Sequence, residues 1–156
     1  HWDGTLGLQG ESVILEAFAR KQFVMQGREV RSYGDRTWSK SDHDLDFIFT
    51  RDGKGYGVEV KNTLRYLDYN EFRTKIEMCR ALNVRPVFAV RMMPKSWIYE
   101  LGRAGGFALV FRFQLYPWTH KALARRVNHE LGLPVDAPRA LESGTMTRFV
   151  NWDEER

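Results

Sequence analysis

Two short runs of strand-forming residues carry acidic and basic side chains whose spacing could bind a metal ion. The runs cover residues 45–50 and 56–61, and the sequence Arg-Asp-Gly-Lys at 51–54 separates them. Asp-Gly between such runs is typical of a two-residue hairpin turn, because both central positions need a positive φ. A turn of this kind pairs Arg51 with Lys54. Since side chains alternate along a strand, it also places Asp46 directly opposite Glu59 on one face.

The pair Asp46 and Glu59 predicts a site for a divalent cation. Directly opposite residues have Cβ atoms about 4.5–5.5 Å apart, and two like charges at that distance destabilise a sheet. Magnesium between them would remove the conflict, because it takes oxygen ligands from one or two carboxylates and keeps several waters. Lys61 follows Glu59 by two residues and projects from the same face. Its ammonium could hold a metal-bound water or contact a scissile phosphate.

The acid-x-Lys tripeptide alone carries little information. A chain of this composition contains roughly one copy by chance, and this chain has two. The other copy, Asp52-Gly-Lys54, lies in the turn and faces no acidic residue. Only the copy at Glu59 and Lys61 belongs to a strand with an aspartate opposite. The alternative interpretation of Asp46, Glu59 and Lys61 is a surface salt-bridge cluster.

Glu11 is a candidate third acid. Residues 10–26 have apolar side chains at helical spacing, with Ile14, Leu15 and Phe18 on one face, and Gly27 is expected to end the helix. Glu11 shares that face and would point towards the sheet. The alternative is that Glu11 only compensates the helix dipole at the first turn.

The other elements predict an α/β fold with a mixed central sheet flanked by helices. Asp68 is expected to cap a helix through Cys79, with Glu71 three residues after the cap. A single domain over residues 1–156 is expected, with its core at about 7–115 and a C-terminal helix and irregular tail at about 116–156. The remaining expectations are an edge strand at 28–33, a loop at 34–43, strands at 86–91 and 107–115, a helix at 94–103, a helix from a Thr119 cap to 131, and an irregular tail from Pro134.

The basic charge suits a phosphate-bearing partner, although in most domains of this composition solubility alone accounts for such a charge. The net charge is +4 with 24 basic and 20 acidic residues, which suits nucleic acid or serves solubility alone. No apolar run is long enough to span a bilayer, so no membrane partner is expected. The single cysteine fits a reducing cytosol. The residues expected to contact DNA are Arg31, Arg36 and Lys40, which could instead form a solvated loop, and Trp38 could stack on a base or anchor its own loop.

Three stretches resemble the PD-(D/E)xK nuclease superfamily, most closely the archaeal Holliday junction resolvases. They are GLQGE at 7–11, DFIF at 46–49 and VEVK at 58–61, and the thirteen-residue step from Asp46 to Glu59 matches those resolvases. The resemblance covers about residues 7–101. It implies a restriction-endonuclease-like core and a cytoplasmic, DNA-associated endonuclease that uses Mg²⁺ or Mn²⁺.

The resemblance also assigns roles within the site. It implies that Glu11, Asp46, Glu59 and Lys61 are catalytic, and that Asp46, Glu59 and the Val60 carbonyl bind the metal. A junction resolvase would act on branched DNA as a homodimer, because paired cuts require two-fold symmetry.

Two departures from the family pattern leave alternatives open. Leu45 stands where the family name has proline, and Asp44 is an alternative metal ligand that would lie opposite Lys61. The loop before Asp46 is longer, and the tail beyond about residue 102 is additional. A restriction-like, sequence-specific endonuclease acting on duplex DNA therefore remains an alternative to a resolvase. A non-catalytic DNA-binding module on the same fold is a third.

Overall fold

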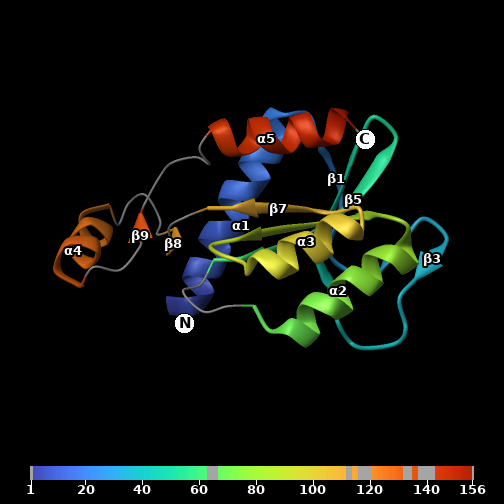
Figure 1. Ribbon diagram of the computed structural model, residues 1–156, viewed down its shortest axis with the longest axis horizontal. Coiled ribbons are helices and arrows are strands. Elements are labelled where there is room, and N and C mark those ends of the chain that lie inside the picture. The colour runs from blue at the N-terminus through green and yellow to red at the C-terminus, as the bar shows by residue number, and fades with distance from the viewer. Residues whose placement is uncertain are drawn as a thin grey trace.

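A computed structural model describes residues 2–62, 67–111, 114–115, 121–131, 135–136 and 143–155. A mixed five-stranded sheet lies in the middle of the fold, with helices on both of its faces (Figure 1). The elements in chain order are α1 (Trp2–Arg20), β1 (Val24–Val30), β2 (Ser32–Tyr33), β3 (Arg36–Thr37), β4 (Leu45–Arg51), β5 (Lys54–Lys61), α2 (Tyr69–Leu82), β6 (Arg85–Val90), α3 (Lys95–Arg103), β7 (Phe107–Val110), β8 (Gln114–Leu115), α4 (Lys121–Leu131), β9 (Val135–Asp136) and α5 (Ser143–Glu154).

The sheet has the order β1-β4-β5-β6-β7. The pairs β1–β4 and β4–β5 are antiparallel, whereas β5–β6 and β6–β7 are parallel. Between β4 and β5 the register runs from Arg51 opposite Lys54 to Phe47 opposite Val58. Asp52 and Gly53 both have positive φ, 53° and 77°, as a two-residue turn requires. The predicted hairpin and its register are confirmed.

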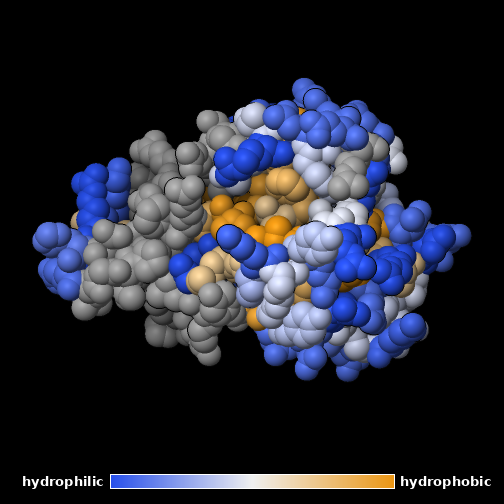
Figure 2. All heavy atoms as spheres, in the orientation of Figure 1, coloured by the Kyte–Doolittle hydropathy of each residue, from blue (hydrophilic) through white to orange (hydrophobic). Residues whose placement is uncertain are grey.

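Two hydrophobic layers hold the helices on the sheet. Helices α1 and α5 cover one face, and α2 and α3 cover the other (Figure 1). In Figure 2 apolar side chains gather over β7, between α5 and α3, and hydrophilic side chains dominate the other described residues on this face. The main members of the α1–α5 layer are Ile14, Phe18, Phe47, Phe49, Tyr56, Val58, Leu109 and Phe149. Those of the α2–α3 layer are Ile48, Phe72, Met78, Leu82, Phe88 and Leu101.

The first helix begins and ends earlier than expected. It ends at Arg20, where Gln22 has a φ of 67° and the Phe23 N–H donates to the Phe18 carbonyl at 3.0 Å. Gly27 is not a helix cap, because it lies at an irregularity in the pairing of β1 with β4. Hydrogen bonding to β4 therefore outweighs the local helical spacing of residues 22–26, and the expected edge strand lies at 24–30 rather than 28–33.

The predicted loop at 34–43 contains one strand of a small hairpin. Strands β2 and β3 pair with each other, not with the main sheet. Trp38 follows the hairpin and is buried, and its Nε1–H donates to the Ser41 hydroxyl at 2.9 Å. The indole packs with α2 residues, including Met78 and Leu82. Trp38 thus anchors its own loop, and a role in base stacking is excluded in this conformation.

The second half of the core is largely as predicted. Asp68 caps α2, because its Oδ2 accepts from the Glu71 N–H at 3.0 Å. Helix α3 ends before Gly105, whose φ is 78°. The strand expected at 107–115 is shorter, since β7 ends at Val110 and the pair 114–115 forms β8 with β9 as partner. Thr119 lies outside the described residues. Helix α4 agrees with the expected C-terminal helix and stands to one side of the core (Figure 1).

The expected irregular tail is wrong. Residues 143–154 form α5, and Phe149 is fully buried in the α1–α5 layer. Its ring stacks on Phe18 at a centroid distance of 5.2 Å and on Phe23 at 5.3 Å. Asp153 accepts a hydrogen bond from the Tyr56 hydroxyl and pairs with Arg51 at 3.2 Å. The C-terminal helix is therefore part of the main core.

Candidate active site

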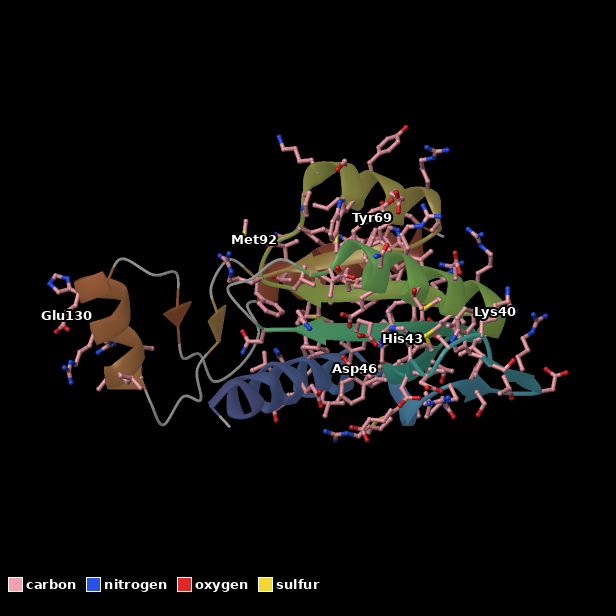
Figure 3. The ribbon with its side chains drawn as sticks, turned by 90° about the horizontal axis from the view of Figure 1, so that it is seen from below. Lys40, His43, Asp46, Tyr69, Met92 and Glu130 are labelled. Carbon is pink, nitrogen blue, oxygen red and sulfur yellow. The ribbon has the colours of Figure 1, made fainter. Side chains whose placement is uncertain are left out.

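Asp46 and Glu59 interlock where the regular pairing of β4 with β5 ends. The Asp46 N–H donates to Oε1 of Glu59 at 2.9 Å, and the Val60 N–H donates to Oδ2 of Asp46 at 2.8 Å. The last paired residues are Phe47 and Val58. Beyond them, the two carboxylates, in place of backbone carbonyls, accept hydrogen bonds from N–H groups of the opposite strand. Figure 3 shows Asp46 on the sheet, between α1 and α2. The predicted pair of acids is brought together.

Burial makes the charge on these carboxylates costly. Burial first, and then the charge of Asp46, raise the pKa of Glu59 to about 8. Burial also raises the pKa of Asp46, although the Val60 N–H opposes the shift. The Glu59 side chain is only 10% exposed. A surface salt-bridge cluster is therefore excluded for Glu59, and a bound cation would relieve the repulsion between the two carboxylates.

Lys75 belongs to the site although it is not among the residues expected there. It lies on the buried face of α2, with its side chain 8% exposed, and its Nζ is 3.0 Å from Oε1 of Glu59. The same ammonium donates to the backbone carbonyl of Asp44. Its charge lowers the pKa of both Asp46 and Glu59. A signal was present in the sequence, because Lys75 lies between Phe72 and Cys79 at the spacing of the apolar stripe.

Lys61 ends β5, close to the acids. Its positive charge lowers the pKa of Asp46, after the Val60 hydrogen bond and the charge of Lys75. The side chain is half-buried. Lys61 forms no ion pair with any of the described residues, so its ammonium is free to meet an anionic group that approaches the acids.

Glu11 faces the site from the other side of the sheet. It lies in the middle of α1, far from the first turn, so compensation of the helix dipole does not explain it. Its carboxylate pairs with Arg28 of β1 at 2.9 Å. Burial first, and then the charge of Asp46, raise its pKa. The charge of Glu11 thus interacts with that of Asp46, as expected of a third acid, and the ion pair with Arg28 fixes the position of the Glu11 carboxylate.

Gly10 explains how α1 comes so close to the end of β5. A Cβ added at Gly10 would lie 2.7 Å from Cβ of Asn62 and 3.3 Å from Cγ1 of Val60. Both distances are shorter than ordinary van der Waals contact. The absence of a side chain at Gly10 therefore allows the helix to bring the neighbouring Glu11 to the acids.

Asp44 is not brought to the site as a ligand. Its Oδ1 accepts from Nε of Arg31 at 3.0 Å, and Arg31 also donates to the Asp42 carbonyl at 3.1 Å. The regular pairing of β4 with β5 does not reach Asp44, so the predicted position opposite Lys61 is not formed. Arg31 is correspondingly held by two neighbouring residues.

The other two residues expected to contact DNA lie apart from the acids. Arg36 donates to the Ala81 carbonyl near the end of α2 at 3.4 Å. The Lys40 ammonium lies 5.9 Å from the centroid of the Trp38 ring, and Figure 3 shows Lys40 well away from Asp46. Both side chains are exposed. Arg31, Arg36 and Lys40 therefore contact three different groups of the protein, namely the Asp44 carboxylate, the Ala81 carbonyl and the Trp38 ring.

The donor set fits a hard cation with open coordination. Among the described residues, no three His, Cys, Asp or Glu side chains group as a metal site, so a cation here would rely on the two carboxylates, a backbone carbonyl and water. Oε1 of Glu59 and Oδ2 of Asp46 are bound by the protein, whereas Oε2 and Oδ1 accept no hydrogen bond from the described residues. Two free carboxylate oxygens suit magnesium, which completes its shell with water and substrate phosphate.

Comparisons with protein-family models, with curated proteins and with solved structures found no match to this chain. Across the described part of the chain, no helix combines the length and the apolar character of a transmembrane span. The geometry and electrostatics of the residues around Asp46 and Glu59 are therefore the basis for a functional assignment.

Proposed function

We propose that this chain is a metal-dependent endonuclease that hydrolyses phosphodiester bonds in DNA. The observation that carries the proposal is the pair of interlocked carboxylates, Asp46 and Glu59. Lys61 lies beside them, and it forms no ion pair with the residues that the structure describes. Glu59 is buried and Asp46 is half-buried, each carboxylate accepts a hydrogen bond from the backbone of the opposite strand, and both pKa values are raised. Perturbed carboxylates gathered in this way favour a functional site.

The fold is compatible with a restriction-endonuclease-like core. A helix, three antiparallel strands, a crossover helix and a parallel strand follow one another as α1, β1-β4-β5, α2 and β6. This order supports the resemblance of the three motif stretches to PD-(D/E)xK nucleases. The small β2–β3 hairpin and the elements after α3 are additions to that core.

Asp46, Glu59 and the Val60 carbonyl would hold Mg²⁺ or Mn²⁺. Such a cation acts as a Lewis acid and makes a bound water more acidic. The chain's part is to hold the two carboxylates at fixed positions, through the N–H groups of Asp46 and Val60. Because the backbone of the protein fixes both carboxylates, the acids would need little reorganisation to hold a cation.

Lys61 and Glu11 have separate roles in the proposal. The Lys61 ammonium orients the attacking water and compensates the negative charge that develops on the phosphate oxygens. Glu11 accepts a hydrogen bond from that water, and Arg28 fixes the direction of its carboxylate. The expected products are a 5′-phosphate and a 3′-hydroxyl.

Two substrate classes are consistent with this chemistry. A Holliday junction resolvase would act as a homodimer on branched DNA. A restriction-like enzyme would cut duplex DNA at a specific sequence. The match of the motif stretches favours the resolvase, whereas the additional hairpin favours the second class. A non-catalytic DNA-binding module is the third candidate, and the presence of both acids with Lys61 argues against it.

The deciding experiment is cleavage of a labelled four-way junction and a matched linear duplex, with Mg²⁺ and with EDTA. The test variant is Lys61→Ala. Its matched control is Lys54→Ala, which removes the second acid-x-Lys lysine at the far end of the same strand. Cutting should require the metal, persist in Lys54→Ala and fall by at least about a hundredfold in Lys61→Ala.

Each outcome separates the candidates. Preference for the junction supports a resolvase, and equal cutting of both DNAs supports a general endonuclease. Tight binding of DNA without cleavage in Mg²⁺ or Mn²⁺ would favour the binding module. If Lys61→Ala cleaves at the wild-type rate, the catalytic role of Lys61 is refuted.

A further inference from the structure

We propose that Lys75 is a positioning residue of this site, which fixes the Glu59 carboxylate so that its free oxygen faces the metal position beside Asp46. The inference rests on the proposed function. It concerns a residue outside the three motif stretches, on a helix that packs against the sheet.

Lys75 connects three segments at one point. Its ammonium lies 3.0 Å from Oε1 of Glu59 on β5 and donates to the carbonyl of Asp44, just before β4. Oε1 of Glu59 also accepts from the Asp46 N–H. Helix α2 thus holds both the acid and the start of the strand that carries the other acid.

The contacts of Lys75 divide the two oxygens of Glu59 between different tasks. Oε1 accepts from the Lys75 ammonium and from the Asp46 N–H, so it is directed into the protein. Oε2 accepts no hydrogen bond from the described residues and is left for a ligand. Two donors on one oxygen restrict rotation of the carboxylate, and this restriction is what a positioning residue provides.

A role in stability alone does not account for a lysine at this place. Burial of an ammonium carries a desolvation penalty, and replacement of a buried ion pair by apolar residues is often neutral or stabilising. The neighbours of Lys75 on α2, Phe72, Ile76 and Cys79, are buried without such a penalty. An apolar side chain would fit the stripe, so the lysine is explained by the acids it contacts.

The two explanations of Lys75 differ in the sign of an effect on metal affinity. A lysine that only balances the charge of Glu59 would compete with a divalent cation, so its removal should strengthen cation binding. A lysine that positions Glu59 prepares the site, so its removal should weaken cation binding. Affinity for the cation is therefore a sharper readout than activity.

The experiment measures Mn²⁺ binding by calorimetry, and junction cleavage in parallel, for wild type, Lys75→Met and Lys75→Arg. We expect Mn²⁺ affinity to fall at least tenfold in Lys75→Met and to recover in part in Lys75→Arg, which keeps the charge. The kcat for cleavage should fall with little change in KM for DNA. Asp153→Asn is the matched control, because it weakens a buried charged contact at the opposite end of the β4–β5 hairpin. It should lose stability but keep its affinity for Mn²⁺.

The outcomes distinguish this inference from the proposed function. Unchanged or stronger Mn²⁺ binding by Lys75→Met, in a wild type that binds Mn²⁺ and cuts DNA, would overturn the positioning role alone. A wild type that neither binds Mn²⁺ nor cuts DNA would overturn the proposed function and this inference together. If Lys75→Met does not fold, Lys75→Arg decides, because its longer planar head should still displace Glu59 and weaken Mn²⁺ binding at least threefold. Wild-type affinity in that variant would refute the role.

Discussion

The carboxylates of Asp46 and Glu59, which would repel each other when both are charged, each accept a hydrogen bond from a backbone N–H of the opposite strand. Glu59 accepts from the backbone of Asp46, and Asp46 accepts from the residue after Glu59. The position of each carboxylate is therefore set by the backbone of the opposite strand. Because the Asp52-Gly53 turn sets the register of these strands, a local turn sequence determines the geometry of the candidate site.

Glu59 should make the metal-free protein less stable as pH rises. Its pKa is raised by burial and by Asp46 from 4.5 to about 8, so between these values the folded state holds a proton that the unfolded chain has lost. The free energy of unfolding should then fall by up to about 1.4 kcal/mol per pH unit. Urea unfolding at several pH values between 5 and 8, in EDTA, measures the slope.

Glu59→Gln is the variant that isolates this slope. It cannot ionise, so the decrease of stability with pH should be smaller than in wild type. Asp46 and Glu11 also have a raised pKa, and they should leave part of the slope. Equal slopes for wild type and Glu59→Gln would show that Glu59 does not hold a proton in this range.

Gly10→Ala should damage both stability and the site. The new methyl group would lie 2.7 Å from Cβ of Asn62, and Asn62 is buried and cannot easily move away. Helix α1 would have to shift from β5, at a cost of about 1–3 kcal/mol, and carry Glu11 with it. Gly102→Ala is the matched control, since nothing lies within 4 Å of its added Cβ. Thermal unfolding and cleavage should change in the first variant only.

The sequence predicts this site well where the determinants are local. The Asp-Gly turn fixes the β4–β5 register, and with it the meeting of Asp46 and Glu59. The apolar stripe of α2 indicates that Lys75 is buried, but it does not indicate the contact with Glu59, because that contact depends on how α2 packs on the sheet. The predicted position of Asp44 opposite Lys61 requires the register to continue beyond Phe47. There side-chain hydrogen bonds replace the ladder, and the Asp44 carboxylate accepts a hydrogen bond from Arg31.

The errors in the fold have the same origin. The end of α1 requires Gln22 in the left-handed region, which a glutamine does not signal. Pairing with β4 then converts residues that have helical spacing into β1. In the C-terminal segment Met146, Phe149 and Trp152 recur every three residues, but proline, glycine and charged residues obscure that stripe. Its burial against Phe18 and Phe107 is a long-range contact.

Phe149→Ala should show that α5 is part of the core. Phe149 is fully buried among aromatic rings of α1, β5 and β7, and truncation of a buried phenylalanine costs about 3–5 kcal/mol. Tyr99→Ala on α3 is the control, because Tyr99 is 70% exposed and its loss should change stability by less than about 0.5 kcal/mol. Urea unfolding compares the two. Equal, small losses would mean that α5 does not contribute to the core in solution.

Lys40→Ala should weaken DNA binding through the loss of one phosphate contact. Of the three residues expected to contact DNA, Arg31 is held by Asp44 and Arg36 donates to the Ala81 carbonyl, whereas the exposed Lys40 ammonium only lies over the Trp38 ring. Removal of one phosphate contact should reduce the slope of log K against log salt by about 0.9. Fluorescence anisotropy with a labelled junction in EDTA measures the slope without cleavage. Lys95→Ala, an exposed lysine on α3, causes the same change in net charge and should leave the slope unaltered. If both variants reduce the slope equally, the effect of Lys40 is one of net charge and the segment before β4 does not contact the DNA.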